Sequence, residues 1–560
     1  MSTKRNTSPF QFAPIPGSQK LAPRDCDVVK DELHGCKRVK FSIQAPMVAS
    51  EAAVQKLLDE VASGARAPLS VAELEAVTGA DVAHIEQIVE AVKVAGLTVL
   101  PRTDADISHG IVRVSGTYAA ARKFLPGLKL SHNRDKKGRM FFARAGEINA
   151  RADLPIEGIF GLDTRRVAKT RYRLLEPTLQ PRAGRTNHGT ARDIARAQGF
   201  PVEEMDKTPV VGGYISLDGD NGEKMQGGLK IAAGKAGIAV TKIVGVPVNG
   251  ATIDGDPDDG ATVENKLDMQ DQALLNPNGV CVVFRAPNDD DSFAQCLEAA
   301  VAFKGAEVNG VLQPLMGVSI SWGMAEVHNT QQSLRRWERT LKAARLRGMF
   351  VTAATGDDGS KDKTRAATPD APSCVAGMIG AAGVELIFDS TGKKVTGEKV
   401  WNDMPFGGAT GGGVSAVFPV TPEELSLGLD PSVFISKSTK KPGHISSTIA
   451  DNAAPATGPL IYNEDGTAST VGGTSSAAPT IFIKLCMIQA ALPKPLPDML
   501  GFVYRNARNG IFNQVTEPGD NGDYSVQPSD LLGVPTGFGV INWPKFLELA
   551  RKEAAGSSTR

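Results

Sequence analysis

The sequence predicts an α/β fold built on a mostly parallel sheet with helices on both faces, preceded by a smaller α+β unit. From about residue 188 onward, short apolar and β-branched runs alternate with segments of helical periodicity. This alternation is typical of strand–helix–strand units with parallel strands. The composition, 41% hydrophobic and 22% charged over 560 residues, suits a globular protein of several domains.

The smaller unit is expected over residues 25–173, after a flexible tail at residues 1–24. Its predicted elements are, in order, strand 39–43, helices 52–62 and 82–95, strands 98–100 and 110–114, and helix 118–124. Their order gives two strand–helix–strand halves. We therefore expect a ferredoxin-like α+β sandwich.

Residues 174–187 contain prolines, a glycine and arginines without periodicity, which predicts an exposed linker open to proteolytic cleavage. The α/β domain is expected over 188–550, with a flexible tail at 551–560. Its predicted strands are 210–217, 238–244, 280–284, 317–321 and 349–354, and its predicted helices are 225–236, 262–274, 292–303 and 330–347. Functional sites in such sheets lie at the carboxyl ends of the strands.

Charge and composition argue against several classes of partner. Lysine plus arginine equal aspartate plus glutamate at 62 each, so no overall field recruits nucleic acid or membrane. No apolar run reaches the length of a membrane span, and the first residues lack the apolar core of a standard signal peptide. We expect a soluble protein. The six cysteines show no zinc-type spacing, and only Cys26 and Cys36 are placed for a bridge.

Three local features carry chemistry. In Gly473–Pro479, small residues surround Ser475 at the predicted start of a buried helix, where the helix dipole favours developing negative charge. Glu264 and Asp268 are four residues apart and share a helix face. Asp357 follows the strand at 349–354. Taken singly, each feature is more often structural: a helix cap, a surface acid pair and a turn.

Taken together and in order, these features resemble the sedolisins, serine-carboxyl peptidases of the kumamolisin type, with the propeptide attached. The resemblance extends from about Val39 to Lys545. The matching stretches are Glu264–Asp268, Ala286–Asn288, Ser319–Gly323, Gly356–Asp357, Val400–Asp403, Thr410–Ser415 and Gly472–Pro479, with Ile111–Gly116 and Gly161–Asp163 matching the family's prodomain.

The resemblance implies a subtilisin-like sheet and a site of four residues. Ser475 would be the nucleophile, Glu264 its general base, Asp268 the support of Glu264, and Asp357 the stabiliser of the oxyanion. A glutamate works as a base near pH 4, where histidine is protonated. The expected function is that of an acid-active serine-type endopeptidase that hydrolyses peptide bonds through an acyl-enzyme on Ser475.

The resemblance also implies that the protein is a self-processing zymogen. Residues 25–173 would be a prodomain that inhibits the peptidase intramolecularly, and the linker 174–187 would be cut on acidification. The expected partners are polypeptide substrates and this prodomain, with no nucleic acid and no membrane. We expect a monomer, and the resemblance points to secretion by a route that the sequence does not reveal.

Departures from the family pattern are visible at the calcium positions, at Ser216, at Ser446–Thr448 and in a shortened loop after Asp357. Calcium is typical of the family, but Gln514 and Gly533 occupy positions where its aspartates belong, so we expect an altered or lost metal site and no certain cofactor. Asp520 and Asp523 lie nearby and could substitute. Ser216 stands where kumamolisin-like enzymes carry a glutamate.

Two alternatives remain open. A sedolisin-like scaffold silenced by these departures would bind without catalysis. A subtilisin-type protease would use His188, since Asn187–Thr190 resembles a subtilisin histidine motif. No aspartate-containing strand precedes that histidine, and a subtilisin would place asparagine at the position of Asp357.

Overall fold

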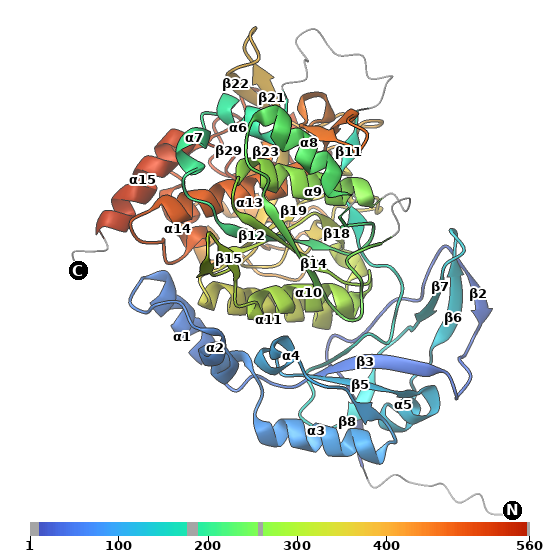
Figure 1. Cartoon of the computed structure of the whole chain (residues 1–560). Coiled ribbons are helices and arrows are strands. Elements are labelled where there is room, and N and C mark those ends of the chain that lie inside the picture. The colour runs from blue at the N-terminus through green and yellow to red at the C-terminus, as the bar shows by residue number, and fades with distance from the viewer. Residues whose placement is uncertain (1–9, 176–188, 224, 256–260, 557–560) are drawn as a thin grey trace, which may run out of the picture.

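The computed structural model describes residues 10–175, 189–223, 225–255 and 261–556, which form two stacked units (Figure 1). His188 and most of the linker predicted at 174–187 lie outside these residues. All six cysteines are free, Cys26 and Cys36 included. Within the described residues, no helix has the length and apolarity needed to cross a membrane.

The first unit confirms the ferredoxin-like prediction. Its four-stranded antiparallel sheet has the order β4-β5-β3-β9, and the helices connect its strands. The strands are β3 (Arg38–Gln44), β4 (Thr98–Val99), β5 (Ile111–Thr117) and β9 (Gly158–Phe160), and the helices are α1 (Glu51–Ala62), α2 (Val71–Thr78), α3 (Val82–Val94), α4 (Asp104–Ser108) and α5 (Tyr118–Phe124). A smaller sheet adds β2 (Cys26–Lys30), β6 (Ser131–Asp135) and β7 (Met140–Ala143).

Both expected tails are shorter than predicted. Within residues 1–24, β1 (Phe12–Pro14) pairs antiparallel with β8 (Asn149–Arg151), and Ile15 is buried. At the other end α15 (Trp543–Gly556) extends into the expected tail and buries Ala554. In each case burial of an apolar side chain fixes backbone whose sequence is otherwise polar.

The second unit contains the predicted large, mostly parallel sheet. Its hydrogen-bonded order is β13-β14-β12-β17-β19-β21-β23-β29-β26, with β22 beside β21. The strands are β12 (Val211–Ser216), β13 (Lys242–Pro247), β14 (Val280–Arg285), β17 (Gly317–Ile320), β19 (Phe350–Ala354), β21 (Ile379–Phe388), β22 (Val395–Val400), β23 (Ile449–Asn452), β26 (Phe512–Asn513) and β29 (Val540–Ile541). The pairings of β22 and β26 are antiparallel, and the rest are parallel.

Helices cover both faces of this sheet (Figure 1). Helices α9 (Thr262–Leu275) and α13 (Thr474–Ala491) pack together on one face, while α10 (Asp290–Ala302) and α11 (Gln331–Leu346) lie on the face turned toward the first unit. The remaining helices are α6 (Ala191–Ala197), α7 (Val202–Met205), α8 (Gln226–Ala236), α12 (Pro422–Ser426) and α14 (Met499–Asn506), and two hairpins join β15 (Ala306–Val308) to β16 (Val311–Gln313) and β27 (Gly519–Asp520) to β28 (Ser525–Val526).

One predicted strand is displaced. Residues 238–244 read as a strand, but β13 begins at Lys242. The reason is the end of α8, where Gly237 adopts a left-handed conformation and the Ile238 N–H still bonds to the Ala233 carbonyl. The first apolar residues of the run are used to close the helix.

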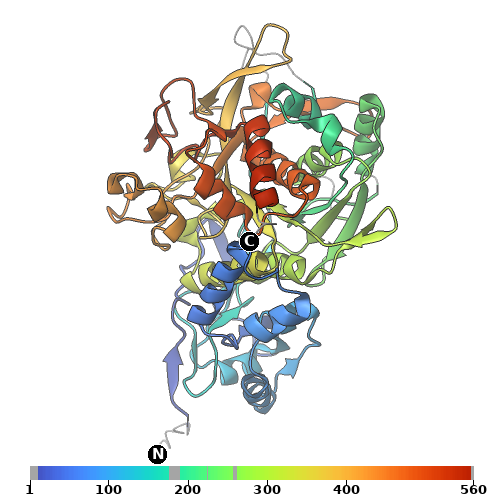
Figure 2. The same ribbon diagram turned by 90° about the vertical axis from the view of Figure 1, so that its left-hand side faces the viewer.

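The interface between the two units is polar as well as apolar. Figure 2 shows the two units turned by 90° from the view of Figure 1. Arg339 of α11 donates to the backbone carbonyls of Ala45 (2.9 Å) and Thr78 (2.7 Å) in the first unit. Ser42 of β3 donates to Asp291 of α10 at 2.7 Å. Breaking one partner of such buried contacts leaves the other unsatisfied, so the interface resists partial opening.

Candidate active site

Ser475 lies at the junction of β25 (Ala468–Gly472) and α13, and Gly473 makes this junction possible. Gly473 has φ +100°, and a Cβ there would lie 2.3 Å from the Arg171 carbonyl oxygen and 2.6 Å from Asp357 Oδ2. Only glycine is tolerated at such an approach. The Ser475 N–H, in the first turn of α13, has no intrahelical acceptor and points outward, where it donates to the Arg171 carbonyl at 2.9 Å.

Two acids on α9 face this serine. Ser475 Oγ donates to Glu264 Oε2 at 2.9 Å, and the Arg171 N–H donates to the same oxygen at 2.9 Å. Asp268, one turn further along α9, accepts a hydrogen bond of 2.6 Å from Ser321 Oγ. The pair predicted from sequence therefore shares a face that is directed at the nucleophile, as the spacing of four requires.

Both carboxyl groups are fully buried, and this dominates their titration. Burial, followed by the field of Asp268, raises the pKa of Glu264 well above its ordinary value. Burial likewise raises the pKa of Asp268, against the opposing hydrogen bond from Ser321. Two donors converge on Glu264 Oε2, so negative charge on the pair is best placed on Glu264.

The fourth predicted residue, Asp357, closes the other side of the site. It follows β19, and its Oδ1 accepts hydrogen bonds from the N–H and the Oγ1 of Thr474, both at 2.8 Å. Asp357 Oδ2 and the Arg171 carbonyl oxygen lie on the same side of Gly473, because both would contact a Cβ placed on that residue. Burial raises the pKa of Asp357 to about 6, although Arg173 opposes the shift. Below that pH the carboxyl group carries a proton that it can donate.

Proline within α13 links the helix to the site. Pro479 has no N–H, so it leaves the Ser475 carbonyl without its helical partner. Ser321 Oγ approaches that carbonyl at 3.3 Å while also bonding to Asp268. Ser321 therefore bridges the helix of the nucleophile and the acid pair, a role that the sequence analysis missed although Ser319–Gly323 was among the matching stretches.

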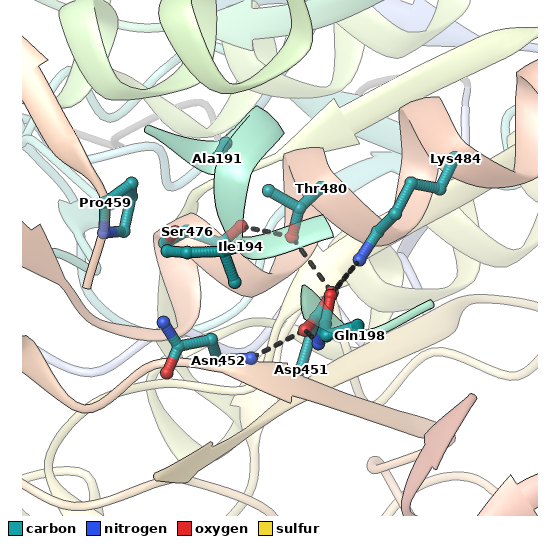
Figure 3. A pocket seen from close by; sticks show the side chains of 9 residues that line it. All are labelled: Ala191, Ile194, Gln198, Asp451, Asn452, Pro459, Ser476, Thr480 and Lys484. Atoms are coloured by element: carbon teal, nitrogen blue, oxygen red, sulfur yellow. Dashed lines mark hydrogen bonds and ion pairs between the residues drawn. The ribbon is translucent and has the colours of Figure 1, made fainter. Parts of the chain in front are cut away.

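A buried polar cluster supports the start of α13 from behind (Figure 3). Lys484 pairs with Asp451 at 2.5 Å, and Asp451 also accepts from Thr480 at 3.2 Å. Ser476, next to the nucleophile, donates to Asp271 of α9 at 2.9 Å. These contacts fix the first two turns of α13 against β23 and α9, so the position of Ser475 is rigidly defined.

The C-terminal segment of the first unit runs through the site. Strand β10 (Lys169–Thr170) pairs antiparallel with β18 (Trp322–Ala325), and β11 (Arg173–Leu174) pairs antiparallel with β25. Arg171 lies between the two strands, with its N–H also 3.2 Å from the Ser321 carbonyl. The chain thus crosses Ser475 in an extended conformation, just before the linker predicted at 174–187.

At the positions that the family resemblance assigns to calcium, the side chain of Gln514 is hydrogen-bonded to backbone carbonyls. Gln514 uses its Nε2 to donate to the carbonyls of Asp530 and Gly537, both at 3.3 Å, and Gly533 and Gly537 bond to each other through their backbones. An amide N–H pointing at these carbonyls competes with a cation for the same oxygens. Within the described residues, no group of three or more histidine, cysteine, aspartate or glutamate side chains is arranged to hold a metal ion.

The site holds a serine hydroxyl that donates to a buried carboxyl group, an arrangement that fits the class of serine-type peptidases. Similarity to known proteins agrees. The chain is 30% identical over 456 residues to kumamolisin from Bacillus sp. (strain MN-32), covering 80% of this chain and 79% of that protein. Pseudomonas sedolisin, a serine-carboxyl proteinase solved with two molecules of pseudo-iodotyrostatin, shares the fold with a TM-score of 0.55 and 20% identity, over 66% of this chain and 99% of that one. No family model matches.

The protein therefore belongs to the kumamolisin-like sedolisin family of serine-carboxyl peptidases.

The raised pKa of Asp268 predicts how stability depends on pH. A carboxyl group whose pKa is raised by folding favours the folded state fully at pH values below its pKa in the unfolded chain, which is near 4. This contribution to the free energy of unfolding is lost as pH rises. We expect the S475A/D268N protein to gain stability relative to S475A between pH 4 and 7, by up to about 1.4 kcal/mol per pH unit. Urea unfolding at several pH values measures this, and a difference that does not change with pH contradicts it.

Proposed function

We propose that this protein is an acid-active serine-type endopeptidase, made as a zymogen that cleaves itself and acting through an acyl-enzyme on Ser475. The observation that carries the proposal is the hydrogen bond of 2.9 Å from Ser475 Oγ to Glu264 Oε2, at a point where a peptide carbonyl rests on the Ser475 N–H. Nucleophile, base and a bound peptide group are within reach of one another, as acyl transfer requires.

In this mechanism Ser475 Oγ attacks the carbonyl carbon while Glu264 takes its proton. The tetrahedral oxygen is held by the Ser475 N–H and by protonated Asp357, which donates from Oδ2. Glu264 then returns the proton to the leaving amine, and later activates the water that hydrolyses the ester. Asp268, fixed by Ser321, positions Glu264 and shares its charge.

The first unit acts as the intramolecular inhibitor in this proposal, because its segment at residues 169–174 pairs with β18 and β25 and covers Ser475. Release exposes Glu264 to water, which reduces the burial that raises its pKa and leaves it able to act as a base in acid. Polypeptide substrates, a monomeric state and secretion are further parts of the proposal, supported by the family resemblance. From the sequence, cleavage is predicted at 174–187, directly after this segment.

The proposed nucleophile and base predict the outcome of acid incubation. Full-length protein held between pH 3 and 7 should shorten, whereas S475A and E264Q should shorten at least about 1000-fold more slowly. The matched control S469A, a change at an exposed serine of β25, should behave as the parent. Intact mass spectrometry follows the reaction. A parent that stays whole with its fold intact would favour the silenced scaffold.

The pKa of Asp357 predicts the pH limit of self-cleavage. Because Asp357 must be protonated to donate, its contribution to the first-order rate should fall as pH rises through about 6, whereas loss of the proton from Glu264, whose pKa burial also raises, acts in the opposite direction in both the parent and D357N. D357N donates an amide N–H at every pH, so we expect it to be slower at pH 4 but to lose this fall. Rate constants measured from pH 3 to 8 decide. If the rate constant of D357N fell with pH in the same way, the fall would have to be assigned to another group.

We also propose that stability does not depend on calcium, since the Gln514 side chain braces the loop at 530–537. Chelation should leave the melting temperature unchanged. Q514A should lower it, by roughly 2–4 °C for the loss of about 1 kcal/mol of hydrogen bonding. Calorimetry with and without a chelator measures both, and a large fall on chelation of the parent would contradict the proposal.

A further inference from the structure

The backbone of residue 171 occupies the place of a residue that is about to be cleaved. Its carbonyl oxygen accepts from the Ser475 N–H at 2.9 Å, and its N–H donates to the Ser321 carbonyl at 3.2 Å and to Glu264 at 2.9 Å. Strands β10 and β11 hold the chain extended on either side. The bond that follows this carbonyl, and so the one presented to Ser475, joins Arg171 to Tyr172.

The side chain of Arg171 fills an acidic pocket. It is 2% exposed, and its guanidinium bonds to both oxygens of Asp362, at 2.9 and 3.1 Å, in the paired geometry that distinguishes arginine from lysine. It also bonds to Asp370, which is completely buried, and lies 3.6 Å from Asp358. Three carboxylates from one stretch of chain, residues 358–370, thus surround a single cation.

The pocket is built rather than incidental. A Cβ on Gly323 of β18 would lie 1.8 Å from Asp370 Oδ1, so glycine in the pocket wall gives the carboxylate its place. Asp362 adopts a left-handed conformation at the end of the short helix after Asp357, which aims its carboxylate inward. Burial raises the pKa of Asp370 well above its ordinary value, and the positive charge of Arg171 opposes this. Without a cation the pocket would confine like charges.

We propose that Asp358, Asp362 and Asp370 form the primary specificity pocket of the peptidase, that it selects arginine, and that self-processing cuts between Arg171 and Tyr172. The inference rests on the proposed function. The proton of Ser475 Oγ passes through Glu264 to the Tyr172 nitrogen as the Arg171–Tyr172 C–N bond breaks and the ester forms. Water then adds to the ester, which restores Ser475 and leaves a carboxyl group on Arg171.

The first test maps the cut in the full-length protein during acid incubation. The earliest new N-terminus should be Tyr172. R171K should slow this cleavage about tenfold, because one ammonium replaces a bidentate fork, and R171Q at least about 100-fold, because the carboxylates lose their cation. An earliest N-terminus elsewhere, or R171Q processing at the parental rate, overturns the assignment of the bond.

The second test asks whether the pocket selects arginine in a substrate or only holds Arg171 in the uncut chain. It supplies the cleavage sequence as a separate peptide. The probe is an internally quenched peptide of residues 169–174 with glutamine in place of Arg173, and matched peptides carry lysine, glutamine or leucine in place of Arg171. Processed parent should cleave the arginine peptide with a kcat/KM at least about 100-fold above that of the leucine peptide. Equal cleavage of both overturns the pocket while the proposed function stands. A parent that neither shortens nor cleaves any peptide overturns both.

A double-mutant cycle assigns the selection to the aspartates. In the D362N/D370N protein, replacing Arg171 by glutamine should change the rate of self-cleavage by less than about tenfold, because only Asp358, 3.6 Å from the guanidinium, remains of the three charges that favour arginine. The control D389N, in the exposed turn between β21 and β22, should keep the full 100-fold effect of R171Q. The full effect persisting in D362N/D370N overturns the pocket.

Discussion

The close backbone approach at Gly473 is the constraint on which the rest of the site depends. It lets a peptide carbonyl reach the Ser475 N–H, brings Asp357 alongside, and starts α13 so that the Thr474 N–H donates to Asp357. Pro479 then frees the Ser475 carbonyl, and the cluster around Lys484 holds the helix from behind. A side chain at position 473 would displace the bound strand or Asp357, and no other part of the site could compensate.

A second consequence concerns charge. The site collects buried carboxyl groups whose pKa values are raised by desolvation, among them Glu264, Asp268 and Asp370. Arg171 of the first unit pairs with Asp370, and Arg173 of the first unit pairs with Asp358, which also pairs with Lys363 of the second unit. The first unit therefore supplies much of the positive charge that faces the acids after β19. Acid conditions would neutralise the same carboxyl groups by protonation, which in the proposed zymogen would couple release of the first unit to low pH.

The sequence predicted much of this, because the predictable features are local. Helical spacing predicts that Glu264 and Asp268 share a face, and local pattern places Ser475 at a helix start and Asp357 after a strand. The resemblance to the sedolisins joined the four into one site, and the structure brings them together. Arg171 was not foreseen. Its role follows from antiparallel pairing with strands some 150 to 300 positions away in sequence, which no local pattern encodes. The tails were misjudged for a similar reason, since a few apolar side chains found distant partners.

The same pairing explains why cleavage would release the segment. Strands β10 and β11 contribute only two residue pairs each to their neighbours, and continuity through Arg171 lets the two short strands hold each other in register. Cutting the chain between them removes that coupling, so each end dissociates independently. The new carboxyl group on Arg171 would also lie beside Glu264 and Asp357, where a further negative charge in a buried site is unfavourable. Product release is therefore built into the geometry that presents the bond.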